Sequence, residues 1–243
     1  MRELDRIASE STLQRCAIVG AGRLGNALAA ALRDAGIEVE GPLGRGAQPE
    51  APVVLLTVPD GEIRAAAEAT PAQLIGHCSG ATTLAPLAGH EAFSLHPLMT
   101  VPDHGATFAG ATAAVAGSTP RALDAARMLA ECLGLRPVEV ADADRAAYHA
   151  AASIASNFLV TLEGAAEELA ATAGVDRAAL VPLVRAAVKN WAAAGAERAL
   201  TGPIARGDED TVARQRDAVA ERTPDLLPLF DALVATTRGL VPA

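Results

Sequence analysis

The chain has 243 residues, of which 51% are hydrophobic and 20% charged, so it holds enough apolar material for one large domain or two modest ones. Its net charge of −9, with no run of Lys or Arg, would repel nucleic-acid phosphates and anionic lipid. Aromatic residues make up only 2%, which leaves few platforms for stacking bases, so we expect no nucleic-acid partner.

The cysteines and the hydropathy pattern narrow the class further. Cys16, Cys78 and Cys132 are odd in number and widely spaced, which argues against a disulfide framework and a structural zinc site. No His, Cys, Asp or Glu cluster has metal-ligand spacing, so we predict no metal. Residues 1–15 lack the apolar core of a targeting segment, and no apolar stretch is long enough to cross a bilayer. We therefore expect a cytoplasmic protein without membrane association.

The first half of the chain alternates short β-type runs with Ala-rich helical runs. We expect strands at 16–19, 37–41, 53–58, 74–78, 92–95, 113–116 and 135–140, with helices at 23–35, 60–69 and 120–133. Asp60 is placed to cap the second of these helices. The alternation is typical of a parallel sheet covered by helices. We therefore predict an α/β Rossmann domain with a doubly wound, mostly parallel sheet over residues 1–141.

Strand-like runs disappear after residue 141, and the remaining sequence predicts a smaller all-α domain over 142–243. A single helical stretch covers 142–173 and stops before Gly174. Asp176 can cap the segment that follows, and Pro182 suits the start of a helix that runs to residue 194. Two more helices begin near Asp208 and Pro224, and Asp208 is free to cap the first of them.

A glycine-rich loop follows the first expected strand. It reads Gly20-Ala21-Gly22-Arg23-Leu24-Gly25 and opens the helix 23–35, which is the context that a dinucleotide-binding GxGxxG motif requires. Gly20 permits the tight turn, Gly22 lets the backbone approach a pyrophosphate, and Gly25 lets the helix pack closely on the strand. The helix N-terminus adds partial positive charge for the phosphates. We assign all six loop residues to a dinucleotide site.

The end of the second strand discriminates NADP from NAD, because NAD enzymes usually carry an acid there and NADP enzymes a cation. Glu40 lies 20 residues after Gly20, but the alternation along 37–40 leaves its direction open. Arg45 is better placed, since its guanidinium can bind a 2′-phosphate. Arg23 could add to this or face solvent. We predict NADP as the cofactor, with NAD possible.

Several motifs together resemble the Rossmann-like proteins that carry a C-terminal helical domain of unknown function, and the resemblance spans nearly the whole chain. The matching segments are Gly20 to Gly25, Leu56-Thr57-Val58-Pro59-Asp60, Cys78-Ser79-Gly80-Ala81, Ser94-Leu95-His96-Pro97-Leu98, His149 with Ser156-Asn157, and Leu200-Thr201-Gly202-Pro203 with Arg206-Gly207-Asp208. Val58 and Pro59 accordingly join the expected cofactor site.

The resemblance implies kinship with ketopantoate reductases, pyrroline-5-carboxylate reductases, prephenate dehydrogenases and 3-hydroxyacid dehydrogenases. In these proteins the helical domain completes the substrate site and commonly dimerises. The resemblance therefore implies a homodimer through the C-terminal helices and a small carboxylate substrate. The hydroxyacid dehydrogenases place a catalytic lysine four residues before an asparagine. Ser153 stands at that position before Asn157, and Lys189 is the only lysine of the chain, on a later helix.

Two residues after the middle strands are candidates for the chemistry. His96 ends the strand 92–95 before Pro97, so we expect it at the sheet edge where doubly wound folds hold ligands, donating to a developing alkoxide. The segment His96-Pro97-Leu98 also resembles the His-Pro-Met segment of prephenate dehydrogenases. Ser79 resembles a substrate-facing serine of the same enzymes, although a turn-forming serine is the alternative.

Polar residues of the long helix and of a later loop complete the candidate set. His149, Ser153, Ser156 and Asn157 share one helix face to within about a turn. This stripe either contacts substrate or makes interhelical hydrogen bonds in a dimer core. Arg206 can form two parallel hydrogen bonds to a substrate carboxylate. The alternative is a surface ion pair with Asp208 or Asp210.

The working hypothesis is an NADP-dependent oxidoreductase with its active site between the two domains. It reduces a small 2-oxo acid, with ketopantoate as the first candidate. Cyclic imine reduction or prephenate-like dehydrogenation is the second enzymatic interpretation. The missing lysine also leaves open a non-catalytic NADP-binding sensor or assembly subunit.

Overall fold

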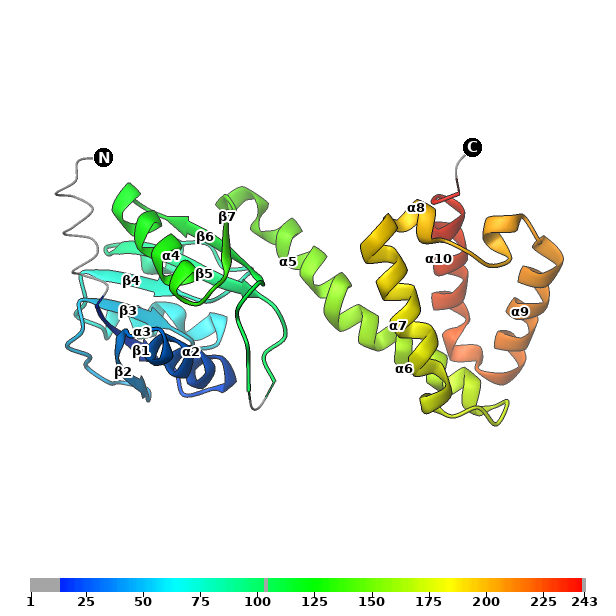
Figure 1. Cartoon of the computed structure of the whole chain (residues 1–243), viewed down its shortest axis with the longest axis horizontal. Helices are drawn as coiled ribbons and strands as arrows, with labels where there is room; N and C mark the ends of the chain where they lie inside the picture. Colours follow the sequence, from blue (N-terminus) through cyan, green and yellow to red (C-terminus); the bar gives the residue numbers. More distant parts are fainter. Residues whose placement is uncertain (1–13, 103–104, 242–243) are drawn as a thin grey trace. The chain divides into compact units, whose positions relative to one another are not determined.

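A computed structural model describes residues 14–102 and 105–241 of the chain (Figure 1). The N-terminal stretch in which we expect no targeting signal therefore lies almost entirely outside the described residues. The chain forms two compact units that divide between Ser156 and Asn157. The last strand ends at Glu139, so the change to all-helical structure precedes this division.

Within the described residues, the first unit contains a seven-stranded sheet in the order β2-β1-β3-β4-β5-β6-β7. Its neighbouring strands are parallel except for the antiparallel pair β5 and β6, which confirms the expected mostly parallel Rossmann sheet. The strands are β1 (Arg15–Val19), β2 (Glu38–Leu43), β3 (Val53–Leu56), β4 (Leu74–His77), β5 (Glu91–Leu98), β6 (Thr112–Gly117) and β7 (Arg136–Glu139).

The two faces of this sheet carry separate apolar cores, as the alternation of side chains along each strand requires. Along β1, Cys16 and Ile18 face one core, whereas Ala17 and Val19 face the other. Helices α2 (Arg23–Asp34) and α4 (Pro120–Cys132) cover the first face, and α3 (Ile63–Glu68) covers the second. Because both faces are covered, the central strand β3 is entirely apolar, whereas the edge strands β2 and β7 carry charged residues.

Strand order places an opening beside the glycine loop. The chain leaves β1 for β2 on one side and then returns to β3 on the other, so the order reverses at β1. In open α/β sheets, ligands bind beyond the carboxyl ends of the strands at such a switch point.

The expected cap at Asp60 is wrong. A short 3₁₀ turn, η1 (Asp60–Glu62), precedes α3, and the residue before it, Pro59, offers no side-chain cap. The Asp60 carboxylate instead accepts hydrogen bonds from the hydroxyls of Ser79 and Thr82. Asp60 therefore links two loops at the carboxyl edge of the sheet.

The single helix expected over 142–173 is also interrupted. The segment consists of the 3₁₀ turn η3 (Asp142–Asp144), α5 (Arg145–Ser153), a π-helical turn η4 (Ile154–Phe158) and α6 (Leu159–Ala171). A π-helical turn inserts an extra residue into the helical repeat, which shifts the register of the side chains beyond it. The expected polar stripe therefore does not continue along one regular helix.

The described residues of the second unit form helices joined by short loops, without a strand. It contains α6, α7 (Arg177–Ala194), α8 (Ala196–Ala199), η5 (Ile204–Arg206), α9 (Glu209–Arg222), η6 (Pro224–Leu226) and α10 (Leu227–Arg238). Asp176 caps α7 by accepting from the N–H of Ala179 at 3.1 Å, as expected. The expected start at Pro182 is wrong, because this cap begins the helix at Arg177 and Pro182 lies inside it.

Helices α9 and α10 are joined by charge-assisted hydrogen bonds. The Arg216 guanidinium donates to both oxygens of Asp231 at 2.8 Å, and Val212 and Val219 of α9 are buried. No helix in the described part of the chain combines the length and the apolar character needed to cross a membrane.

Candidate functional site

The glycine loop joins β1 to α2, and its backbone lies very close to neighbouring backbone atoms. Gly20 has a φ of 120°, and a Cβ there would lie 2.5 Å from the carbonyl oxygen of Thr57. A Cβ on Gly25 would lie 1.9 Å from the carbonyl oxygen of Gly20, whereas one on Gly22 would meet nothing within 4 Å. The three glycines thus provide the turn, the open approach and the close helix packing that the motif requires.

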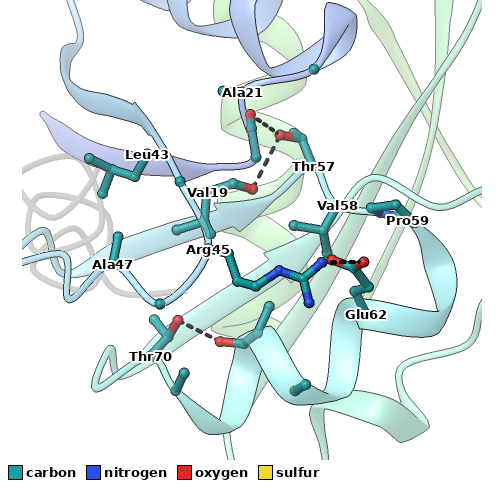
Figure 2. Close-up of a pocket in the computed structure, with 17 residues that line it drawn as sticks. Val19, Ala21, Leu43, Arg45, Ala47, Thr57, Val58, Pro59, Glu62 and Thr70 are labelled. Carbon is teal, nitrogen blue, oxygen red and sulfur yellow. Dashed lines mark hydrogen bonds and ion pairs between the residues drawn. The ribbon is translucent and has the colours of Figure 1, made fainter.

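Side chains outside the motif fix the shape of this loop. The Thr57 hydroxyl donates to the carbonyl oxygen of Gly20 at 2.9 Å (Figure 2). The Asn26 amide donates to the carbonyl oxygens of Ala21 and Gly22 at 2.9 and 3.0 Å. Sequence reasoning missed the role of both residues. Thr57 lies in a matching segment of the resemblance, but nothing in its neighbourhood indicates a bond to a loop 37 residues away.

A cavity of about 390 Å³ opens beside the loop, a volume in the range of small-molecule sites. Its walls come from the ends of β1, β2 and β3 and from one side of α3 (Figure 2). Six of the predicted cofactor residues line it, namely Gly20, Ala21, Gly22, Arg45, Val58 and Pro59. The other three, Arg23, Leu24 and Gly25, belong to the first turn of α2.

Two charged residues of the cavity wall form an ion pair. Arg45 reaches from the loop after β2 to Glu62 of η1, with Nη2 2.6 Å from Oε1 (Figure 2). The Arg45 side chain is 83% exposed and that of Glu62 is 39% exposed. Glu40 is engaged elsewhere, since its carboxylate accepts from the N–H groups of Glu50 and Ala51, both at 3.1 Å. Arg45 rather than Glu40 therefore faces the cavity.

His96 does not end its strand, contrary to the prediction. Strand β5 continues to Leu98, because β6 pairs with it beyond the end of β4 and places His96 opposite Ala114. However, β4 ends at His77, opposite Ser94, so His96 still lies past the carboxyl end of its parallel neighbour. The pairing with β6 thus extends the strand without moving His96 away from the ligand-binding edge.

His96 forms a cluster with two residues of α5. Its Nδ1 lies 2.7 Å from the Tyr148 hydroxyl oxygen, and the two rings meet edge to face. The His149 ring lies 6.3 Å from the His96 ring, centroid to centroid. Gly80 lies against both imidazoles, since a Cβ there would come within 2.8 Å of His96 and 2.9 Å of His149. A residue without a side chain thus allows both rings to pack directly on this loop.

Burial sets the protonation states of His96 and Tyr148. It lowers the pKa of His96 to about 4, with further electrostatic lowering from the neighbouring His149 and Arg145. Burial also raises the pKa of Tyr148, an effect that Arg145 opposes. At neutral pH, His96 is an uncharged imidazole beside an uncharged phenol. Their mutual hydrogen bond uses one of their two protons, so the pair can donate one hydrogen bond to an oxygen or nitrogen that gains electron density.

Ser79 is engaged within its own loop. Its hydroxyl donates to Asp60 at 2.8 Å and accepts from the N–H groups of Thr82 and Ala81 at 2.9 and 3.2 Å. These contacts agree with the turn-forming alternative for Ser79, and a substrate-facing role stays a prediction. His77 is buried below the same loop, with Nε2 3.0 Å from the carbonyl oxygen of Thr83.

A buried arginine ties the segments of the cluster together. The Arg145 side chain is 1% exposed. Its guanidinium donates to Asp142 at 3.2 Å, to the carbonyl oxygen of Ser79 at 3.3 Å and to the Ser94 hydroxyl. Sequence reasoning missed Arg145, because Ser94 and Ser79 lie 51 and 66 residues away along the chain. Tyr148 was missed too, although it is the only tyrosine and directly precedes His149.

The remaining predicted residues lie farther along the chain. Ser153 is the last residue of α5, and Asn157 lies in the π-helical turn, where its carbonyl oxygen accepts from Thr161 at 3.2 Å. Arg206 ends the turn η5 of the second unit. Asp208 caps α9 through the N–H of Thr211 at 3.0 Å, as expected. Of the predicted chemical residues, Ser79, His96 and His149 thus come together in the first unit.

Metal binding has no support from the side chains of residues 14–102 and 105–241, since no group of three or more His, Cys, Asp or Glu there could hold an ion. Cys16, Cys78 and Cys132 are free thiols.

Comparisons with solved structures agree on the fold. BF3122 from Bacteroides fragilis, described provisionally as an NADP oxidoreductase, superposes with a TM-score of 0.79 at 19% identity, over 93% of this chain and 98% of the other. Protein TM1727 from Thermotoga maritima superposes with a TM-score of 0.78 at 23% identity, over 93% of this chain and 97% of the other. A pyrroline carboxylate reductase from Plasmodium falciparum with NADP bound superposes with a TM-score of 0.59 at 10% identity, over 94% of this chain and 98% of the other.

Sequence comparison places the chain in a family whose function is not defined. A search of the curated proteins found no match. The family model described as "Domain of unknown function (DUF2520)" matches residues 111–237, a span that begins just before β6 and leaves out the glycine loop. Since this match covers more than half of the 243 residues, the protein belongs to the DUF2520 family.

Proposed function

We propose that the chain binds NADP(H) at the glycine loop and reduces a small carbonyl or imine compound. One observation carries the proposal: the same edge of the sheet holds both an open glycine cradle and a neutral proton donor, His96 hydrogen-bonded to Tyr148. A dinucleotide needs the cradle, and reduction of a polar double bond needs the donor.

The loop fits the diphosphate of a dinucleotide. Gly22 leaves the approach open, and helix α2 begins there without a side-chain cap, so the first N–H groups of the helix are available to phosphate oxygens. Arg45 would hold a 2′-phosphate, and Val58 and Pro59 line the cavity that would take the adenosine. The similar reductase from Plasmodium falciparum has NADP bound, which supports the assignment.

When bound, a reduced nicotinamide supplies the hydride, and the residues of the chain manage the proton. With the Tyr148 hydroxyl donating to Nδ1, the His96 ring carries its proton on Nε2. That N–H can then give its proton to the substrate oxygen or nitrogen that gains electron density, while the Tyr148 hydroxyl passes its own proton to Nδ1 and regains one from solvent. A positioned acid of this kind contributes about 10²–10⁴-fold to the rate. Arg145 is a positioning residue, because it holds α5 against the loop of Ser79.

For the substrate we propose a small 2-oxo acid, with ketopantoate first. The second candidate is a cyclic imine, which is favoured by the similarity to a pyrroline carboxylate reductase. Within this proposal Arg206 is the candidate for the substrate carboxylate, while Ser153 and Asn157 remain candidate polar contacts.

The test is loss of NADPH absorbance with a panel of 2-oxo acids and cyclic imines. Turnover with a member of the panel, reduced at least a hundredfold in His96→Asn, would support the proposal. Tight NADPH binding without turnover on any compound would favour the non-catalytic sensor instead.

We further propose that a second copy of the chain covers the helical unit. Helices α6, α7 and α10 bury none of their described residues. Their exposed apolar side chains include Val160 at 71%, Leu183 at 67% and Trp191 at 59%. Light scattering after size exclusion should give a dimer that Leu183→Glu weakens. A monomer at high protein concentration would contradict this proposal.

A further inference from the structure

The ion pair at the mouth of the cavity has a direct bearing on cofactor choice. Glu62 and Arg45 both line the cavity, and their charged ends lie 2.6 Å apart (Figure 2). We infer that Glu62 is a specificity-determining residue, which competes with the 2′-phosphate of NADP(H) for Arg45 and so weakens the preference for NADP(H) over NAD(H). This inference rests on the proposed binding of NADP(H) at the glycine loop.

The competition follows from charge. A 2′-phosphate that binds Arg45 must share the guanidinium with the Glu62 carboxylate or displace it. If they share the guanidinium, two anions lie close together, and if the phosphate displaces Glu62, the existing ion pair is lost. NAD(H) carries a neutral 2′-hydroxyl at this position and suffers neither penalty. Glu62 therefore acts against one cofactor and not the other.

Glu62 is also the acidic residue that the local structure leaves facing the cavity. The Glu40 carboxylate is occupied by the backbone N–H groups of Glu50 and Ala51. The Asp60 carboxylate is occupied by the hydroxyls of Ser79 and Thr82. Glu62 is held at the cavity by the turn η1, in which its N–H donates to the carbonyl oxygen of Pro59 at 2.8 Å.

The strength of the pair sets the size of the effect. Because Arg45 is 83% exposed, the pair is solvated and worth little, which allows an incoming phosphate to break it. Removing the carboxylate should therefore tighten NADPH binding by about three- to tenfold at low salt, and by less as salt increases. NADH affinity should stay within about twofold of its original value.

The experiment is a fluorescence titration of the whole chain with NADPH and with NADH, comparing Glu62→Gln with the original protein. Glu68→Gln is the matched control, since it removes the same charge from α3 at an exposed position outside the cavity. We expect the NADPH-to-NADH affinity ratio to rise in Glu62→Gln but not in Glu68→Gln. In the Arg45→Ala background the gain should disappear, because the group for which Glu62 competes is gone.

Four outcomes would overturn the inference. Three are an unchanged ratio in Glu62→Gln, an equal rise in Glu68→Gln, and a gain that persists without Arg45. The fourth is weaker NADH binding in Glu62→Gln, which would assign the carboxylate to the ribose hydroxyls. In all of these NADPH still binds, so the proposed function survives, whereas a chain that binds neither nucleotide contradicts the function itself. Glu62→Ala repeats the test if Glu62→Gln does not fold.

Discussion

The glycine loop and the His96 cluster lie at the same edge of the sheet but are built in different ways. The loop is made of backbone, and its two closest approaches, at Gly20 and Gly25, involve carbonyl oxygens that cannot move aside. The cluster is made of side chains from β5 and α5 that pack on the loop after β4. A substitution at Gly20 or Gly25 should therefore disrupt the whole loop. A substitution in the cluster should remove a single functional group and leave the protein folded.

The sharpest test of this difference is Gly25→Ala, for which we expect the largest effect. The new methyl would lie 1.9 Å from the carbonyl oxygen of Gly20, so α2 must shift or the loop must open. We expect NADPH binding to be lost and the protein to be destabilised by about 2–4 kcal/mol. Thermal unfolding and an NADPH titration measure both effects.

Gly22→Ala is the matched control, since a Cβ there meets nothing within 4 Å. This variant should keep the stability of the unsubstituted protein and lose only affinity for NADPH. Equal destabilisation in the two variants would show that the loop is not constrained as the structure indicates.

Within the cluster, we expect His96→Asn and Tyr148→Phe each to lower turnover by about 10²–10⁴-fold while NADPH binding is retained. The two groups share one hydrogen bond, so the double variant should lose little more than the stronger single variant. Gly80→Ala should also lower turnover, because its methyl would push the His96 and His149 rings out of place. Additive losses in the double variant would show that the two residues act separately.

Arg145→Met tests the link between the cluster and the fold. The substitution removes a buried guanidinium that bonds Asp142, Ser79 and Ser94, and it leaves the Ser94 hydroxyl buried without this partner. We expect urea unfolding to show that the free energy of unfolding falls by about 2–4 kcal/mol. For the exposed control Arg64→Met it should change by no more than about 0.5 kcal/mol. A decrease in the free energy of unfolding no larger than that of Arg64→Met would show that Arg145 does not link the cluster to the fold.

The pH dependence of stability should be the smallest of these effects. Because the pKa of His96 is lowered to about 4, the unfolded chain binds a proton near pH 6.5 that the folded chain excludes until about pH 4. The contribution of neutral His96 is thus present above pH 6.5 and is lost as the pH falls toward 4. The stability difference between the original protein and His96→Asn should shift by about 1–3 kcal/mol across this window. A difference independent of pH would contradict the burial of His96.

Local sequence predicted the backbone site well. A strand, three glycines and a helix are consecutive in the chain, so their spacing alone requires the close packing at Gly20 and Gly25 and the open approach at Gly22. The expected caps at Asp176 and Asp208 succeeded for the same reason, since a cap bonds to residues three positions away.

Long-range partners account for what the sequence could not predict. Asp60 had the position of a helix cap, but hydroxyls 19 and 22 residues away compete for its carboxylate. His96 had the position of a strand end, but pairing with β6 extends the strand. The bond between His96 and Tyr148 joins residues 52 apart, and only the packing of α5 brings them together.

The most direct test of the account is a calorimetric titration of the 243-residue chain with NADPH and NADH. We predict one saturable site for each nucleotide, with NADPH bound more tightly, and a difference that Arg45→Ala narrows by about tenfold. Failure of the folded chain to bind either nucleotide would contradict the assignment of the glycine loop as a dinucleotide site. An unchanged preference in Arg45→Ala would remove Arg45 from the recognition of the 2′-phosphate.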